Sequence, residues 1–368
     1  MRRPTPALAA LTCLTLAGCS VSGGTPAASR TPSPAASRPP PSPSPSPSPV
    51  FGPLTLDGLF HPAQAVPADP AQVRTLIATG DVIPARMVNV EATRRNDFLW
   101  PFRPTAPLLR SADMTWVNLE TPIFAGCPLA ETGFTFCGDG RFVNGLTFAG
   151  VNVANLGNEH IHNYGDRGVN ATLQLLASHS INYSGLGHTA YIDVRGLTFA
   201  LLGFNAVEAT VDTAEMAREI AAARARAGVV VVQFHWGREY DRQPAAAPGV
   251  APQDPVMLGH LAIDDGADLV IGNHQHWYEG VEVYKGHLIT YAHGNFIFDQ
   301  SWSEDTEEGV VGKYTFYGNR LVAATWTPVH IDGLDGQPSI MAPAPAAQVL
   351  STMERASRQL AARLGEPG

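Results

Sequence analysis

Basic residues are scarce in this 368-residue chain, and the shortage narrows its range of partners. Only 24 lysines and arginines stand against 33 aspartates and glutamates. Four of the arginines precede residue 53, so the remainder carries 20 basic and 33 acidic residues, a net charge of −13. Such a surface disfavours generic binding to nucleic acid or to anionic surfaces. We therefore expect no nucleic-acid partner.

Cysteines are equally few, and the four present lack the CxxC spacing of a zinc site. Cys13 and Cys19 fall in the N-terminal segment discussed below. Cys127 and Cys137 close a short loop, and in an oxidising exterior they predict a disulfide. Two reduced thiols are the alternative.

Long apolar runs are absent from the N-terminal segment, where residues 1–18 have the features of an export signal. Arg2 and Arg3 supply the positive start, and the apolar stretch 7–16 is too short to span a bilayer. The sequence LAGC at 16–19 resembles the lipobox of bacterial lipoproteins, which predicts a diacylated Cys19 and stable membrane anchoring. Simple secretion with a chance cysteine is the alternative.

Residues 19–52 follow as a segment of almost only proline, serine, alanine, glycine and threonine. Such a composition buries no core, so we expect an extended tether that holds the folded part away from the membrane. The folded domain is then predicted at 53–345, followed by a C-terminal segment 346–368 with an amphipathic helix at 346–364. No internal repeat is evident.

Short apolar strands alternate with helical patterns over most of the predicted domain, which indicates a sheet covered on both faces. The predicted strands are 73–78, 114–118, 151–155, 181–184, 197–204, 229–234 and 269–271. The predicted helices are 171–178, 214–227 and 255–264. Residues 280–298 and 310–330 lack helical patterns and carry turn signals, so antiparallel hairpins are predicted there. The whole suggests an α/β fold with two sheets face to face and helices outside.

Polar side chains follow five of the predicted strands, where the carboxyl ends of parallel strands share one edge of a sheet and bind ligands. The clusters contain Asp81, Glu120, Glu159 with His160, His235, and the pair His274 and His276. Several imidazoles and carboxylates on one edge are costly without a cation between them. The set therefore predicts a site for one or two divalent transition metals, with Mn, Fe and Zn equally suited.

The motifs TGDVIPAR, VNLETPI, GNEHIHNYG, FHWGREY and GNHQHWYEGVEVYKGHLITYAHGNFIFDQ resemble, in order and spacing, the CapA family of capsule and poly-γ-glutamate biosynthesis proteins. That family is similar in fold to calcineurin-like metallophosphoesterases. The resemblance covers about residues 73–302 and implies a four-layer α/β/β/α sandwich. It also implies metal ligands at Asp81, Glu120, His235, His274 and His276, with His160 beside the substrate.

Three departures from the family pattern affect the predicted site. Glu159 stands where an asparagine ligand is expected, so it either binds the metal more strongly or points away. The aspartate usual three residues after His160 is Asn163, and Asp81 lacks the histidine two residues later that two-metal phosphoesterases carry. Further contacts to substrate are predicted at Arg86, Asn158, His162, Glu239 and Asn295, and His160 and His235 are the predicted catalytic residues.

Three functions remain open at this point. The first is a metal-dependent hydrolase outside the membrane, in which the ion polarises a phosphoryl or carbonyl oxygen and activates water while His160 protonates the leaving group. Its substrate is a phosphoester or an amide-linked anionic polymer. The second is a holder of an anionic capsule polymer during export or attachment, working with membrane synthase or export subunits. The third is an envelope protein whose metal site is vestigial.

Overall fold

The computed structural model describes residues 51–62 and 69–365. The predicted signal peptide, the predicted lipidation site Cys19 and nearly all of the predicted tether lie outside the described residues. Within the part of the chain that is described, no helix is both long enough and apolar enough to cross a membrane.

The first sheet is mixed, with strand order β16-β15-β14-β1-β2-β5-β6 and with β13 paired to β1. Strands β1, β2, β5 and β6 run parallel, whereas β14, β15 and β16 continue the sheet in antiparallel pairs. The bounds are β1 Val73–Val82, β2 Met114–Leu119, β5 Val153–Asn155, β6 Asn182–Ser184, β13 Asn295–Ile297, β14 Glu308–Tyr317, β15 Arg320–Ile331 and β16 Pro338–Ile340.

The second sheet has the order β11-β12-β10-β9-β8-β7, in which β8, β9, β10 and β12 are parallel. Its central strand β9 begins with four consecutive valines and is buried over its whole length; β-branched residues of this kind are favoured in strands that are covered on both faces. The bounds are β7 Ala190–Val194, β8 Leu197–Asn205, β9 Val229–His235, β10 Leu269–Asn273, β11 Val281–Tyr284 and β12 His287–Thr290. A separate small sheet pairs β3 Ile123–Phe124 with β4 Gly138–Asp139.

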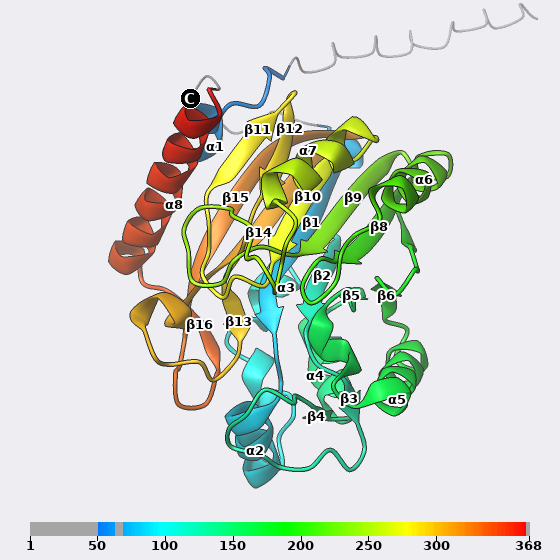
Figure 1. Ribbon diagram of the computed structural model, residues 1–368, viewed down its shortest axis with the longest axis vertical. Helices are drawn as coiled ribbons and strands as arrows, with labels where there is room; N and C mark the ends of the chain where they lie inside the picture. The colour runs from blue at the N-terminus through cyan, green and yellow to red at the C-terminus, as the bar shows by residue number, and fades with distance from the viewer. Residues whose placement is uncertain (1–50, 63–68, 366–368) are drawn as a thin grey trace, which may run out of the picture. The chain divides into compact units, whose positions relative to one another are not determined.

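Helices cover the outer faces of both sheets (Figure 1). Three apolar layers result: one under α2, α4 and α5 on the first sheet, one between the sheets, and one under α6 and α7 on the second sheet. Helix α8 lies along one side and packs against β11 and β15. The helices are α1 Leu56–Phe60, α2 Arg86–Arg95, α3 Ala106–Leu109, α4 Phe142–Ala149, α5 Gly165–Ser178, α6 Thr213–Arg224, α7 Pro255–Asp264 and α8 Pro343–Leu364.

This four-layer α/β/β/α arrangement confirms the predicted fold class. Two details differ from the expectation. The parallel strands are divided between two sheets rather than sharing one, and the predicted hairpins extend both sheets, with β11–β12 in the second and β14–β15 in the first. The reason is that strand partners are chosen by long-range packing of apolar faces, which local sequence patterns do not encode.

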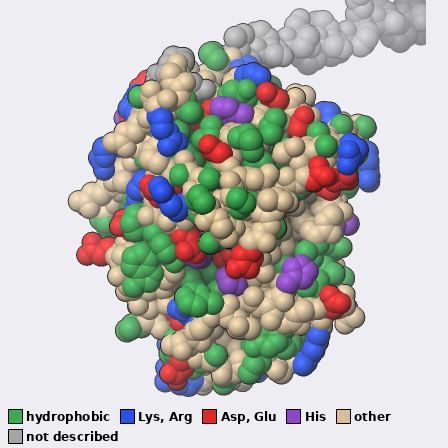
Figure 2. Space-filling view, viewed as in Figure 1, with side chains coloured by type: hydrophobic (Ala, Val, Ile, Leu, Met, Phe, Trp, Pro, Cys, Tyr) green, Lys and Arg blue, Asp and Glu red, His purple; other side chains and the backbone are tan. Residues whose placement is uncertain are grey.

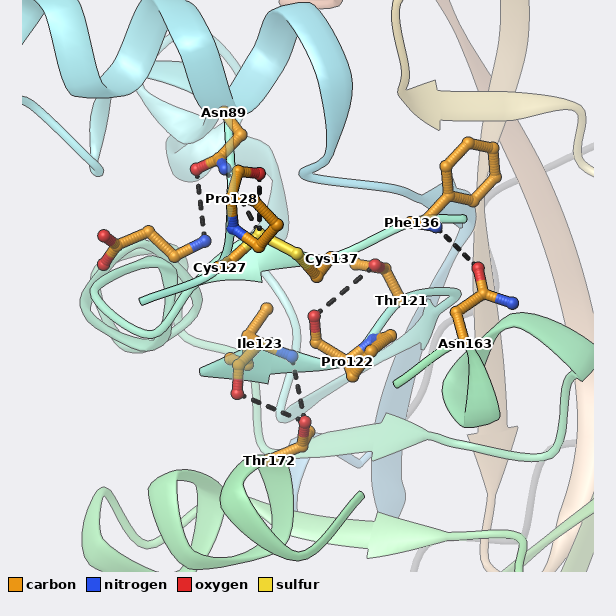
Figure 3. Close-up of a disulfide and its surroundings, with 11 residues drawn as sticks. Asn89, Thr121, Pro122, Ile123, Cys127, Pro128, Phe136, Cys137, Asn163 and Thr172 are labelled. Atoms are coloured by element: carbon orange, nitrogen blue, oxygen red, sulfur yellow. Dashed lines mark hydrogen bonds between the residues drawn. A yellow bond between two sulfur atoms is a disulfide. The ribbon is translucent and has the colours of Figure 1, made fainter. Parts of the chain in front are cut away.

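A disulfide joins Cys127 and Cys137, whose Cα atoms lie 5.9 Å apart, and closes a loop beside the small sheet (Figure 3). The Asn89 side chain connects this loop to α2, because its amide contacts Cys127 Sγ at 3.5 Å and its oxygen accepts from the Asp139 amide at 3.1 Å. Next to Cys137, the Phe136 amide donates to Asn163 Oδ1 at 2.6 Å. The loop is therefore tied to the segment that carries His160.

Removal of this disulfide is expected to destabilise the protein. The double substitution Cys127→Ser and Cys137→Ser removes the covalent link between two residues that are ten positions apart. The unfolded chain then gains conformational entropy. In the chain-entropy model the free energy of unfolding then falls by about 2–3 kcal/mol. Guanidinium unfolding of the oxidised wild type and the double variant measures the difference. Equal midpoints and slopes would show that the bridge adds no stability.

Candidate metal centre

Four side chains from four separate segments meet where the two sheets end. Glu120 follows β2, Glu159 begins the short 3₁₀ helix 159–162 after β5, His235 ends β9, and His274 follows β10. One ligand atom from each lies within 4.8 Å of every other. The site therefore lies where the carboxyl ends of strands from both sheets meet. The expectation from the sequence, that it lies along the edge of a single sheet, was wrong.

The contacts within this metal cluster, as we name Glu120, Glu159, His235 and His274, are close. His235 Nε2 lies 3.0 Å from Glu159 Oε2 and 3.5 Å from Glu120 Oε1. His274 Nδ1 lies 3.4 Å from Glu159 Oε1. Glu159 thus points inward and takes the place of the asparagine expected from the family pattern.

The backbone after β10 is held in an uncommon conformation that aims both histidines of the HxH pair. His274 has φ 105° and His276 has φ 58°, values that residues with a Cβ atom rarely adopt. Each costs of the order of 1–3 kcal/mol, and such residues concentrate at functional sites. Just before them, a Cβ atom on Gly272 would lie 1.8 Å from the Tyr291 carbonyl oxygen, so only glycine fits.

Asp81 and His276 form a second pair beside the metal cluster. His276 Nδ1 lies 3.3 Å from Asp81 Oδ2 and 2.9 Å from Asn295 Oδ1. Asp81 is positioned by β13, since its amide donates to the Gly294 carbonyl at 3.0 Å. These two predicted ligands lie outside the group of four, next to it rather than within it.

Asn118 connects the pair to the metal cluster, and sequence reasoning did not assign it a role. Its side-chain amide donates to Asp81 Oδ1 at 2.8 Å and to Glu120 Oε2 at 3.3 Å. Its oxygen accepts from Asn155 at 3.2 Å and from Asn158 at 3.3 Å. The available signal was its spacing of two residues from Glu120 at the end of a strand, which places both on one side.

The cluster is strongly charged and buried. Burial and the neighbouring Asp81 carboxylate raise the pKa of Glu120 to about 8. Burial alone would raise the pKa of Glu159 as well, but His235 and His274 lower it well below its usual value. Burial likewise opposes the charge on His276, yet Asp81 raises the pKa of that imidazole to about 9. Neighbouring opposite charges therefore favour the ionised forms of Glu159 and His276, whereas burial favours the protonated form of Glu120.

Several buried atoms of the site lack a hydrogen-bond partner of good geometry. They are Asp81 Oδ2, Glu120 Oε1, Glu159 Oε2, His235 Nε2 and both ring nitrogens of His274. Buried polar atoms are rarely left unpaired, so these need an explanation. Two carboxylates and two imidazoles that converge with free lone pairs fit a divalent transition metal such as Mn, Fe or Zn.

Acidification is expected to weaken metal binding here. Burial alone would lower the pKa of His235, but the carboxylates of Glu159 and Glu120 raise it well above its usual value. A proton therefore competes for the ligating nitrogen even near neutral pH, and metal binding must release it. For each proton released, the affinity for Mn²⁺ should fall about tenfold per pH unit. Calorimetric titrations from about pH 8 down to about pH 6 test this; a constant affinity would contradict it.

His160 lies next to the metal cluster and is partly exposed. Its Nε2 is 3.8 Å from Glu159 Oε1, and its side chain is 17% exposed. Its Nδ1 lies 3.0 Å from Asn163 Oδ1, the same oxygen that accepts the Phe136 amide. Because that oxygen only accepts, His160 carries its proton on Nδ1 when neutral, and Nε2 faces the metal cluster. Burial lowers the pKa of this imidazole.

The predicted substrate contacts divide into two groups. Asn158 and Asn295 are buried and fully engaged: Asn158 donates to the Leu119 carbonyl and caps the 3₁₀ helix, and Asn295 orients His276 and donates to the Thr306 carbonyl. These hydrogen bonds hold neighbouring parts of the site in place, and contact of the two residues with substrate stays a prediction. His162 is exposed, and Glu239, 40% exposed, has its Oε1 3.8 Å from His276 Nε2.

Arg86, another predicted substrate contact, is partly exposed and already engaged in an ion pair. Its guanidinium is paired with Asp299 at 3.0 Å and lies over the Phe298 ring at 4.7 Å, with 16% of the side chain exposed.

On the face shown in Figure 2, acidic and histidine side chains gather near the middle of the molecule beside hydrophobic ones.

Comparison with known proteins identifies the family. Residues 75–300 match the family model "Bacterial capsule synthesis protein PGA_cap", well over half of the chain. The chain is 28% identical over 292 residues to capsule biosynthesis protein CapA of Bacillus anthracis, covering 72% of this chain and 68% of that protein. It is 29% identical over 275 residues to PGA biosynthesis protein CapA of Bacillus subtilis (strain 168), covering 68% and 70%.

Among solved structures, a hypothetical protein from Thermus thermophilus matches with a TM-score of 0.47 and 15% identity, covering 69% of this chain and 98% of that one. The family match falls on the segment that contains every residue of the metal cluster. The chain belongs to the bacterial capsule synthesis protein PGA_cap family, within the metallophosphoesterase-like superfamily.

Proposed function

We propose that this protein is a metal-dependent hydrolase that acts outside the cell membrane in the synthesis, export or attachment of a capsule polymer or poly-γ-glutamate. The observation that carries the proposal is the metal cluster itself, with four convergent ligands whose lone pairs are unused. The names of its relatives, which are capsule and PGA biosynthesis proteins, support the process.

The chemistry follows from the residues around the cluster. A bound divalent ion supplies Lewis acidity towards a phosphoryl or carbonyl oxygen. His160 presents Nε2 towards this position, held by Asn163 on the other ring nitrogen. Water attacks the phosphorus or the carbonyl carbon, and His160, when protonated at Nε2, donates that proton to the leaving oxygen of a phosphoester or to the leaving nitrogen of an amide as the old bond breaks. Burial disfavours its charged form, and an approaching anionic group restores it.

The observed direction of Glu159 argues against a vestigial site. A carboxylate that pointed away would leave three ligands and an incomplete cluster. Instead it contacts both His235 and His274. The non-catalytic polymer holder is thereby left as the alternative outcome of the test below.

Membrane attachment through a diacylated Cys19 is part of the proposal, and rests on the LAGC sequence at 16–19. Two acyl chains are sufficient for stable anchoring. A membrane synthase or export subunit is the proposed partner. Fractionation of cells that express the wild type or Cys19→Ser tests this, with the variant expected to move from the membrane to the soluble fraction.

Hydrolysis is tested directly with purified protein, a panel of phosphomonoesters, phosphodiesters and poly-γ-glutamate, and added Mn²⁺. We expect cleavage of at least one substrate, abolished by a chelator and restored by the metal. Tight metal binding without cleavage of any substrate would favour the polymer holder instead.

A further inference from the structure

Phe136 is a buried residue that contacts His160 in two ways. It lies in the segment 127–137 that the disulfide closes, which we call the disulfide loop, and it is 2% exposed. Its ring packs against the imidazole, with the two ring centroids 4.3 Å apart. Its amide N–H donates to Asn163 Oδ1 at 2.6 Å, as Figure 3 shows. Because Asn163 also contacts His160, Phe136 acts on the same imidazole both directly and through a neighbour.

The amide contact sets the orientation of the Asn163 side chain. A side-chain amide has one end that accepts and one end that donates, and a backbone N–H only donates. The Phe136 N–H therefore selects the orientation in which Oδ1 faces it. The same oxygen lies 3.0 Å from His160 Nδ1. An acceptor is thus kept at Nδ1 of His160, and the proton that this imidazole gives up must come from Nε2.

Phe136 is itself held firmly, whereas His160 depends on its neighbours for orientation. The residue after Phe136 is Cys137, which the disulfide fixes. The edge of the Phe298 ring packs against the Phe136 ring with centroids 5.5 Å apart, and the guanidinium of Arg86 lies 5.9 Å from its centre. His160, in contrast, lies on a short 3₁₀ helix and has 17% of its side chain exposed.

We propose that Phe136 is a positioning residue for His160. Its ring limits the rotation of the imidazole, and its amide orients Asn163. His160 Nε2 is thereby kept directed at the metal cluster, where it lies 3.8 Å from Glu159 Oε1. This inference rests on the proposed function, in which His160 donates a proton to the leaving group. Position matters for that step, because a displacement of about 1 Å can cost about 100-fold in rate.

The kinetic test uses Phe136→Ala, which removes the ring and keeps the N–H. We expect kcat for an alkyl phosphoester to fall about 10- to 100-fold, with KM and metal content unchanged. The loss should be smaller with a p-nitrophenyl ester, whose leaving group needs little protonation. In a His160→Ala background the same substitution should cause no further loss, because residues that act through one another are not additive.

Phe134→Ala is the matched control, because it removes the same type of side chain from the disulfide loop at a position that is 72% exposed. Its turnover should equal that of the wild type. Equal losses on both esters for Phe136→Ala, or a further loss in the His160→Ala background, would show that Phe136 acts on the fold and would overturn the inference. If circular dichroism shows that Phe136→Ala is unfolded, Phe136→Leu enters the same comparisons, with a smaller loss of the same pattern expected.

A spectroscopic test separates this inference from the proposed function. In ¹⁵N-histidine NMR of the Zn²⁺-loaded protein at about pH 8, where an imidazole is neutral, the signals missing from His160→Ala identify His160. We expect its proton on Nδ1 in the wild type and in Phe134→Ala, and a mixture of both tautomers in Phe136→Ala. An unchanged tautomer in Phe136→Ala overturns the inference. If the wild type cleaves no substrate, the hydrolase assignment fails, and the NMR result alone decides whether Phe136 positions the imidazole.

Discussion

We expect the replacement of His235 by alanine to abolish metal binding at physiological metal concentrations. This imidazole is fully buried and contacts both carboxylates of the metal cluster, at 3.0 and 3.5 Å. Loss of a residue that only supports a ligand already costs about 10- to 100-fold in affinity, so loss of a ligand should cost about 100-fold or more. Elemental analysis of the purified variant, and titration with Mn²⁺, measure the loss.

His330→Ala is the matched control, because His330 is an exposed histidine on β15, outside the metal cluster. Its metal content should equal that of the wild type. Circular dichroism establishes that both variants are folded. A folded His235→Ala protein with undiminished metal content would remove the basis for the proposed site.

Replacement of His160 by alanine should reduce turnover by about 10²- to 10⁴-fold while leaving the metal in place. The reason is its position: Nε2 faces Glu159 at 3.8 Å, outside the group of four ligands, and Nδ1 is held by Asn163. The variant therefore loses a proton donor and keeps every ligand of the metal cluster. Steady-state hydrolysis of the best phosphoester, with metal content determined on the same sample, measures both.

A substrate with an activated leaving group provides an internal check on this role. A p-nitrophenyl ester needs little protonation of its leaving oxygen, so the loss for His160→Ala should be smaller with it than with an alkyl ester. His188→Ala, at an exposed histidine between β6 and β7, should retain full activity. Equal losses on both esters would rule out proton donation by His160.

The fold could be predicted as far as it depends on local pattern. Runs such as the four valines of β9 identify a buried strand without any knowledge of its neighbours. The three-residue strand β13 could not be found this way, because it exists through its pairing with β1, more than 200 residues earlier. The same limit explains why the division of the parallel strands between two sheets was not foreseen.

In the site, too, the sequence predicted only what depends on local pattern. His235 and His274 directly follow apolar runs, and the structure places them at the ends of β9 and β10, where their ring nitrogens converge. The direction of Glu159 depended on the 3₁₀ helix that Asn158 caps, and sequence left it open. The positive φ values of His274 and His276 could not be predicted from the sequence, because such values are uncommon for any residue other than glycine, although histidine adopts them more often than most.

The division of the four ligands between the sheets affects when the site can be completed. Glu120 and Glu159 belong to segments of the first sheet, and His235 and His274 to segments of the second. As the polypeptide is made from its N-terminus, the first half offers only two carboxylates, which discriminate poorly among divalent ions. The imidazoles of His235 and His274 are synthesised later, with the second sheet. On the proposed function, we therefore expect a metal ion to bind only after the second sheet has folded, and to come from the compartment in which that folding takes place.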